Sequence, residues 1–225
     1  MVDFAIQRLN MVESQVRPSD VTDRRIMRAM QNIAREQFVP EDVRAVAYAD
    51  SDLPFTITPA DGGPAAGFLL APRVFAKMVQ ALEIGSGNVV LDVACGTGYS
   101  TAVLSQLAQT VVAIDQHDSM VDFATRALAD CGVDNAVVVH KDLKAGYPEE
   151  GPYDAVIING LVAEVPDTIL DQLKDGGRLV TIEGAAGIGA GVQWRRLGGT
   201  FDRRWLFDAG APRLPAFERK QEFAF

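Results

Sequence analysis

Residues 90–99 constrain the fold of this 225-residue chain more than any other segment. They read Val-Leu-Asp-Val-Ala-Cys-Gly-Thr-Gly-Tyr, so an apolar run passes directly into a turn with two glycines, and a helical pattern follows. Glycine lets the backbone approach a ligand closely because no Cβ intervenes. A strand, a glycine turn and a helix in this order are typical of the nucleotide-binding turn of α/β proteins. The segment therefore predicts such a turn.

From residue 72 onward, helical and strand patterns alternate at short intervals, which is typical of a doubly wound, mostly parallel sheet. The predicted strands are 89–94, 110–114, 136–139, 155–158 and 178–182, and the predicted helices are 72–82, 99–107, 119–130 and 168–173. Two later strands, 192–197 and 201–207, flank Gly198-Gly199 and predict an antiparallel hairpin that closes the sheet. The predicted class is α/β and Rossmann-like.

The first 71 residues have a different pattern and predict a helical and loop extension packed on a core of residues 72–225, in one structural domain overall. A helix is predicted over residues 3–16, ended by Arg17-Pro18, and Thr22 can cap a second helix that ends at 38–40. Residues 51–67 contain three prolines and three glycines and predict a long loop. A loop of this length in a compact protein is usually functional or mobile.

The composition excludes several classes of protein. A net charge of −9 argues against a surface that binds duplex nucleic acid, and the pairs Arg195-Arg196 and Arg203-Arg204 are interpreted as solvated or ion-paired strand edges. Two cysteines and two histidines without ligand spacing predict no disulfide framework and no metal site. No signal peptide or bilayer-spanning run is evident, so a cytoplasmic location is predicted.

The residues around the glycine turn indicate which cofactor is bound. Asp115 ends the predicted strand 110–114, where a carboxylate can accept hydrogen bonds from both ribose hydroxyls of an adenosine. A dinucleotide site favours glycine where this chain has Thr101, and the charge of Asp92 suits a sulfonium better than a pyrophosphate. The pattern favours S-adenosylmethionine, with an NAD(P)-dependent oxidoreductase as an alternative.

Residues 92–100 resemble the motif series of class I methyltransferases, and the whole pattern is similar to protein-L-isoaspartate O-methyltransferases over about residues 11–180. The segments that carry the resemblance are 92–100, Asp115, Asp142-Leu143, 175–180, Met11-Val12, Phe38-Val39-Pro40, 47–50, Leu53-Pro54 and 153–158.

The resemblance implies a cofactor site and a role for each part of it. The methionine end would be lined by Asp92, Ala94, Gly96 and Gly98, with Cys95 and Thr97 completing the loop and Asn159 beside it. Asp115 would hold the ribose. Gln116 would flank the adenine, Asp142 would accept a hydrogen bond from the adenine amino group, and Leu143 would pack on the adenine ring. Ala94 replaces a glycine usual in the family, which predicts a slightly narrower pocket.

The acceptor side departs from the family, which carries a Gly-Gln-Thr-Ile-Ser-type stretch before the helix at 72–82. This chain has Gly-Phe-Leu-Leu-Ala at residues 67–71, without a side-chain hydroxyl or amide. Either Thr56 and Thr58 take the place of the missing hydroxyls as catalytic residues, or the acceptor site is different, and the second is favoured. Phe68, Leu69 and Leu70 would form an apolar wall or pack in the core.

The sequence thus predicts an S-adenosylmethionine-dependent methyltransferase related to the isoaspartyl repair enzymes, which methylate a carboxylate of a damaged protein or peptide. Activity on isoaspartyl peptides is expected to be weak or absent. The alternative is a cofactor-binding homologue with a different acceptor, such as an unknown small molecule, or with a non-catalytic, partner-binding role.

Overall fold

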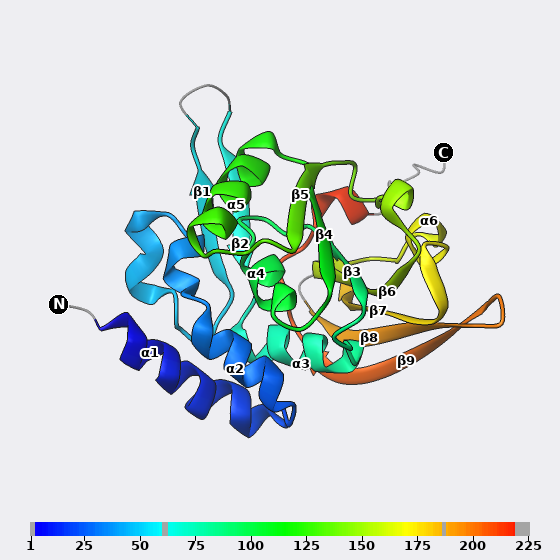
Figure 1. The fold of residues 1–225 in the computed structure, drawn as a ribbon, viewed down its shortest axis with the longest axis horizontal. Coiled ribbons are helices and arrows are strands. Elements are labelled where there is room, and N and C mark those ends of the chain that lie inside the picture. Colours follow the sequence, from blue (N-terminus) through cyan, green and yellow to red (C-terminus); the bar gives the residue numbers. More distant parts are fainter. Residues whose placement is uncertain (1–2, 60–62, 186–187, 219–225) are drawn as a thin grey trace, which may run out of the picture.

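The computed structural model describes residues 3–59, 63–185 and 188–218. Its centre is a seven-stranded sheet with the order β5-β4-β3-β6-β7-β8-β9 (Figure 1), which confirms the predicted α/β class. The strands are β3 (Val89–Val93), β4 (Thr110–Asp115), β5 (Ala136–His140), β6 (Tyr153–Val162), β7 (Leu173–Ala185), β8 (Ile188–Leu197) and β9 (Thr200–Ala209).

The glycine turn follows β3, the strand at which the order of strand addition reverses. β3 pairs in parallel with β4 on one side and with β6 on the other. The chain therefore builds outward from β3 through β4 to β5 and then returns to β6 across β3. In open parallel sheets, ligands bind outside the carboxyl ends of the strands at such a switch point.

The end of the sheet confirms the predicted hairpin. β7 pairs antiparallel with β8, and β8 pairs antiparallel with β9. Gly198 and Gly199 join β8 to β9 with φ values of +56° and +84°, which a residue with a side chain rarely adopts.

Four helices flank the sheet: α3 (Pro72–Leu82), α4 (Tyr99–Ser105), α5 (Asp118–Asp130) and α6 (Asp167–Leu170). Successive strand residues point to opposite faces. Val90 of β3 faces the hydrophobic cluster under α3, α4 and α5, whereas Leu91 faces the cluster shared with α6 and the C-terminal segment. The predicted helix 168–173 is too long, because Leu173 already pairs with Tyr153 as part of β7.

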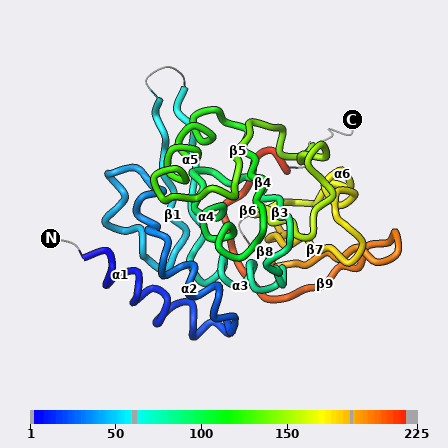
Figure 2. Tube along the Cα trace, viewed as in Figure 1, coloured from blue at the N-terminus to red at the C-terminus, as the bar shows by residue number. Residues whose placement is uncertain are grey.

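The N-terminal segment lies beside α3 and α4 (Figure 2). Asp3 caps α1 (Phe4–Met11). A π-helical turn over Val12–Val16 and a 3-10 turn over Arg17–Ser19 continue this helix, in agreement with the helix predicted over residues 3–16. α2 (Arg24–Asn32) is capped by Asp23, whose carboxylate accepts from the Arg25 amide at 2.8 Å.

Two details of the predicted second helix are therefore wrong. Thr22 is not its cap, and the helix stops well before residue 38 because Ile33 adopts an extended conformation with ψ of 123°. Two 3-10 turns follow, over Arg35–Phe38 and Glu41–Val46.

The predicted loop over residues 51–67 is also wrong, because this region forms a hairpin of β1 (Leu53–Ile57) and β2 (Ala65–Leu69). Leu53, Phe55 and Ile57 are buried while the residues between them are exposed, which is the period of two of a half-buried strand. An alternation of only five residues is a weak signal among the prolines and glycines of this region. Figure 1 shows that the hairpin stands beside α5.

Two buried hydrogen-bonding groups organise the first 71 residues: Arg35 joins segments within them, and Thr97 attaches them to the core. Arg35 is 1% exposed; its Nε donates to the Ala47 carbonyl at 2.7 Å and its Nη2 donates to the Leu70 carbonyl at 2.9 Å. Thr97, in the glycine turn, donates to the Phe38 carbonyl at 2.5 Å. A boundary at residue 71 stays a prediction, since side chains from both parts share one hydrophobic cluster.

Within the described ranges, no helix combines the length and the apolar character that crossing a bilayer requires.

Candidate active site

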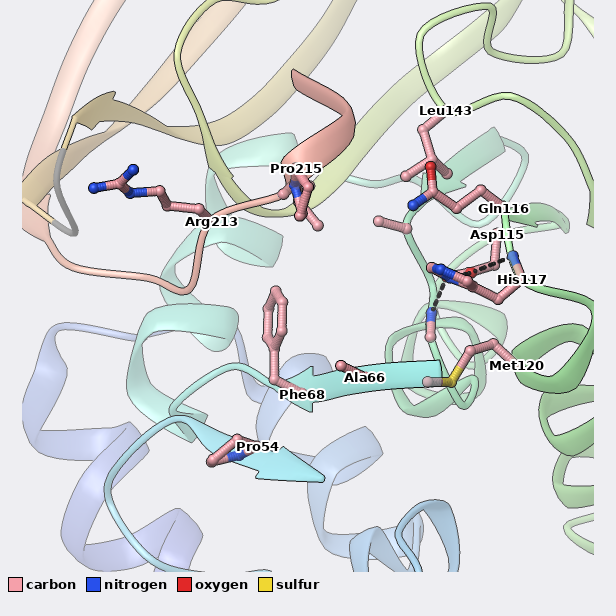
Figure 3. A pocket seen from close by; sticks show the side chains of 14 residues that line it. Pro54, Ala66, Phe68, Asp115, Gln116, His117, Met120, Leu143, Arg213 and Pro215 are labelled. Carbon is pink, nitrogen blue, oxygen red and sulfur yellow. Dashed lines mark hydrogen bonds and ion pairs between the residues drawn. The ribbon is translucent and has the colours of Figure 1, made fainter. Parts of the chain in front are cut away.

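A cavity of about 290 Å³ lies outside the carboxyl ends of β3 and β4. Figure 3 shows it between β2 on one side and the loop that follows β4 on the other. Its lining combines three parts of the chain: the hairpin contributes Pro54, Ala66, Gly67 and Phe68; the core contributes Ala94, Gly96, Asp115, Gln116, His117, Met120 and Leu143; and the C-terminal segment contributes Arg213, Leu214 and Pro215.

Asp92 is fully buried and organises the glycine turn from beneath. Its Oδ2 accepts from the hydroxyls of Ser100 and Thr101, both at 2.7 Å, and its Oδ1 accepts from the Asn159 amide at 2.6 Å. Burial raises the pKa of Asp92 to about 6, although the three hydrogen bonds favour the ionised form. The carboxylate joins β3, α4 and β6, and it lies below the cavity rather than in its wall.

Asp115 lines the cavity directly and is also bonded to the turn. Its Oδ2 accepts from the Gly96 amide at 3.0 Å, and its Oδ1 accepts from the His117 amide at 3.0 Å and contacts His117 Nδ1 at 3.2 Å. The dashed lines in Figure 3 follow these contacts. A carboxylate is thus fixed at the end of β4, where the sequence predicted it.

The turn uses left-handed backbone at three residues. Ala94, Gly96 and Gly98 have φ values of +56°, +55° and +92°. For alanine this conformation costs about 1–2 kcal/mol, which explains why glycine is usual in the family at the place of Ala94. A Cβ on Gly96 would have only the Phe68 carbonyl within reach, at 4.0 Å, whereas a Cβ on Gly98 would stand 3.0 Å from the Ala124 Cβ. Gly96 therefore borders the cavity, while Gly98 permits the approach of α5.

Some of the other predicted cofactor residues line the cavity, and the rest lie outside its wall. Gln116 and Leu143 line the cavity. Cys95 and Thr97 are buried beside it, and burial raises the pKa of the Cys95 thiol. Asn159 is 8% exposed and is bonded to Asp92, and Asp142 is exposed, with Oδ1 accepting from the Lys144 amide at 2.7 Å.

The predicted catalytic pair does not line this cavity. Thr56 and Thr58 border a separate hollow together with Ser119, Asp122 and Arg126. In the stretch 67–71, only Gly67 and Phe68 reach the cavity, and Leu69 and Leu70 are buried in the core. The expected apolar wall is therefore formed by Phe68 with residues from elsewhere in the chain.

The C-terminal part of the wall was missed by sequence reasoning. The Leu161 amide donates to the Pro212 carbonyl at 2.8 Å and the Leu214 amide donates to the Leu161 carbonyl at 3.0 Å, so this segment lies along the end of β6. A Cβ on Gly160 would stand 2.6 Å from Leu214 Cγ, so a glycine there makes room for Leu214. The segment has no periodic pattern by which it could have been found.

Comparisons with known proteins show which family the chain belongs to. The family model described as Protein-L-isoaspartate(D-aspartate) O-methyltransferase (PCMT) matches residues 7–186. The chain belongs to this family. The protein-L-isoaspartate O-methyltransferase of Methanoculleus marisnigri is 38% identical over 77% of this chain and 76% of that protein. The enzyme of the same name from Herpetosiphon aurantiacus is 37% identical over 80% and 77%.

Solved structures show the same fold. A protein-L-isoaspartate O-methyltransferase covers 95% of this chain and 67% of its own, with a TM-score of 0.76 and 22% identity. A beta-aspartate methyltransferase homologue from Plasmodium falciparum, solved with S-adenosyl-L-homocysteine, covers 93% of this chain and 98% of its own, with a TM-score of 0.76 and 18% identity.

As a member of the PCMT family, the protein is an S-adenosylmethionine-dependent methyltransferase, and S-adenosylmethionine is its cofactor. Across the described residues of this PCMT-family chain, no three His, Cys, Asp or Glu side chains are grouped so that they could hold a metal ion.

Replacement of the buried carboxylate should change how stability depends on pH. Because the pKa of Asp92 rises from 3.8 in the unfolded chain to about 6 in the fold, the folded state binds more protons across this interval. Its contribution to stability is therefore present below pH 4 and is lost as the pH rises to 6 and above, by about 3 kcal/mol. Urea unfolding at several pH values should show this loss in the native chain and its absence in Asp92→Asn; equal pH slopes would contradict it.

The two glycines of the turn should respond differently to a methyl group. Gly96→Ala should cost about 1–2 kcal/mol of backbone strain but should weaken S-adenosylhomocysteine binding strongly, because its Cβ borders the cavity. Gly98→Ala should lose more stability, about 2–4 kcal/mol, because strain and the clash with Ala124 add. Thermal unfolding and calorimetric titration measure the two effects. The reverse order of stabilities would show that α5 does not restrict Gly98.

Proposed function

We propose that this protein transfers the methyl group of S-adenosylmethionine to a carboxylate of a polypeptide chain, and that it turns over isoaspartyl peptides slowly. The names of its relatives, which are protein-L-isoaspartate O-methyltransferases, support a polypeptide carboxylate as the acceptor. The observation that carries the second part is that none of the described residues lining the cavity has a side-chain hydroxyl.

The cavity fits S-adenosylmethionine, which would supply an electrophilic methyl group when bound. The fixed carboxylate of Asp115 would accept hydrogen bonds from the ribose hydroxyls. Gln116 and the buried side chain of Leu143 would contact the adenine. The turn at Ala94 and Gly96 would bring the backbone close to the methionine end, and Asp92 beneath it would balance the positive charge.

Apart from Arg213, the side of the cavity that we assign to the acceptor is apolar. Phe68 projects from β2 toward the cavity (Figure 3), with Pro54 and Ala66 on the same face of the hairpin. Leu214 and Pro215 face them from the C-terminal segment. A carboxylate is ionised at neutral pH, so methyl transfer to it needs no general base. What the enzyme must supply is position. On this wall the side-chain donor among the described lining residues is the Arg213 guanidinium, whose Nη1 lies 3.7 Å from the Glu218 carboxylate, and the remaining surface is unfavourable for a charge.

The same wall favours a second candidate, an acceptor that carries an apolar group beside the atom to be methylated. Apolar surface removed from water contributes about 25 cal/mol per Å² to binding. Contact with Phe68, Pro54 and Leu214 would strengthen the binding of such a group and would weaken the binding of a bare isoaspartyl carboxylate. A cytoplasmic role in protein repair is part of the first candidate and stays a prediction.

Asp115→Ala should weaken S-adenosylhomocysteine binding by about 1–3 kcal/mol, since two hydrogen bonds to a charged acceptor are lost. Asp115→Asn keeps one acceptor oxygen and should lose less. Calorimetry with one site per chain measures both. Because Asp115 also accepts from the Gly96 amide, unfolding of each variant must be measured in parallel. Unchanged affinity in a folded Asp115→Ala protein would refute the ribose role.

Methyl incorporation into an isoaspartyl peptide tests the acceptor. We expect the native chain to be slow, and Phe68→Gln, which places an amide donor on the acceptor side, to be at least about tenfold faster. Phe68→Leu keeps the wall apolar and serves as the control, and binding of S-adenosylhomocysteine should be the same in all three. Robust turnover by the native chain would overturn the proposal. Loss of that turnover in a Thr56→Val, Thr58→Val double variant would then assign it to the two threonines.

A further inference from the structure

The seven-stranded sheet has two edges, and only one of them is protected against pairing with another strand. β9 forms one edge, and it carries four charged side chains and a register shift opposite Gly191 and Val192. Charges and bulges of this kind keep a free edge from adding a strand. β5 forms the other edge; its residues 136–140 read Ala-Val-Val-Val-His and keep a regular register along β4. β5 therefore has no bulge, no proline and no Asp, Glu, Lys or Arg.

The backbone of β5 has hydrogen-bonding groups on the side away from β4. Within the described part of the chain, β5 pairs with β4 alone. The Asn135 carbonyl accepts from β4 and the Lys141 amide donates to β4, each at 3.0 Å, so these odd-numbered residues face β4. The N–H and C=O groups of successive strand residues point to opposite sides. The groups that point to the free edge are therefore those of Ala136, Val138 and His140.

The side chains along this edge are apolar and incompletely covered. Val137 is 48% exposed, and Val138 and Val139 are half-buried. Three consecutive valines favour an extended strand, because β-branched side chains suit a pleated surface. An apolar strand with free backbone groups is the arrangement that pairs with a strand of another molecule.

A second copy of β5 fits this edge. Two copies can pair in antiparallel orientation about a two-fold axis at Val137, which sets Ala136 of each copy opposite Val138 of the other. The backbone groups of Ala136 and Val138 both point outward, so each of these two pairs exchanges two main-chain hydrogen bonds. The two exposed Val137 side chains then face each other on the axis and are removed from water together.

The charges next to the strand favour this register. With the axis at Val137, the exposed carboxylate of Asp134 in each copy lies opposite His140 of the other. Both ring nitrogens of His140 face oxygen acceptors, the Asp118 carboxylate at 2.9 Å and the Gln116 carbonyl at 2.9 Å, an arrangement that suits the cationic ring. Opposite charges in such cross-strand positions stabilise the pairing.

A neighbouring register is unfavourable for the same reason. An axis at Val138 would set Asp134 of each copy opposite Asp142 of the other, and like charges directly opposite each other destabilise a strand pair. The whole chain has a net charge of −9, so two copies repel each other over most of their surface. The uncharged residues 136–139 are a place where two copies can meet without this repulsion.

We propose that two copies of this chain associate through antiparallel pairing of their β5 edges, so that their seven-stranded sheets join into one continuous sheet about a two-fold axis at Val137. The association leaves β9 as the edge of the joined sheet at both ends, where its charges and bulge prevent further growth. It does not depend on the methyl acceptor.

Proline at position 138 tests the backbone pairing. The Val138 N–H points outward, so Val138→Pro removes no hydrogen bond to β4, and proline is compatible with an edge strand. We expect the native chain to sediment as a dimer, and Val138→Pro to raise the dissociation constant of the dimer at least about tenfold, since two main-chain hydrogen bonds are lost. Circular dichroism and S-adenosylhomocysteine binding show that the variant is folded. A native chain that is monomeric at every concentration, or a dimer that the proline does not weaken, would overturn the proposal.

A charge on the axis tests the position of the interface. Val137→Lys sets two like charges opposite each other and should also weaken the dimer at least about tenfold. Leu197→Lys makes the same change of charge at a side chain that is 43% exposed in the β8–β9 hairpin, and it should leave the dimer intact. Equal weakening by the two variants would assign the effect to net charge and would overturn the placement at β5.

Cysteine crosslinking tests the register. Val137→Cys should form a disulfide-linked dimer under mild oxidation, because Cα atoms of a non-hydrogen-bonded antiparallel pair are about 4.5 Å apart, a distance that a disulfide spans. Val139→Cys, which lies away from its own copy in this register, should not. The native chain controls for the partly buried Cys131. A dimer that links through Val139→Cys and not through Val137→Cys would overturn the axis at Val137.

Discussion

A buried carboxylate supports the whole cofactor side of this protein. Asp92 is removed from water at the end of β3, which is unfavourable for a charge unless hydrogen bonds replace those of water. Ser100 and Thr101 donate to it from the first turn of α4, and Asn159 donates from β6. These bonds fix the glycine turn over the switch point of the sheet. The Gly96 amide of this turn donates to Asp115, so the position of this wall residue also depends on the buried carboxylate of Asp92.

The N-terminal segment completes that wall from outside the sheet. Arg35 is buried against the Tyr99 ring, 4.7 Å from its centroid, and its guanidinium holds the carbonyls at residues 47 and 70. Thr97 holds the Phe38 carbonyl from within the turn. A buried cation needs such acceptors, and its contact with the Tyr99 ring brings the segment that carries β1 and β2 against α4, the helix that follows the glycine turn. This arrangement places β2 beside the cavity, which Ala66, Gly67 and Phe68 line.

The two sides of the cavity are built by different means. On the side that we assign to the cofactor, strand ends and a glycine turn position the backbone and a few side chains, as in other switch-point sites. On the side that we assign to the acceptor, Phe68 and Leu214 come from segments far apart in the sequence, and none of the described lining residues has a side-chain hydroxyl.

The sequence by itself determined the parallel core, the glycine turn, the place of Asp115 and the C-terminal hairpin, because each depends on local periodicity or on residues adjacent along the chain. It misread the hairpin at residues 51–67, since five alternating residues give a weak signal among prolines and glycines. It predicted Asp92, Asn159 and Gly98 as cofactor residues but not the contacts that the structure adds: Asn159 donates to Asp92, and Gly98 packs against α5. Only the tertiary structure decided that residues 213–215 close the cavity, that Leu69 and Leu70 face the core, and that Thr56 and Thr58 border another hollow. These outcomes depend on which distant segments pack together, and no local pattern encodes that.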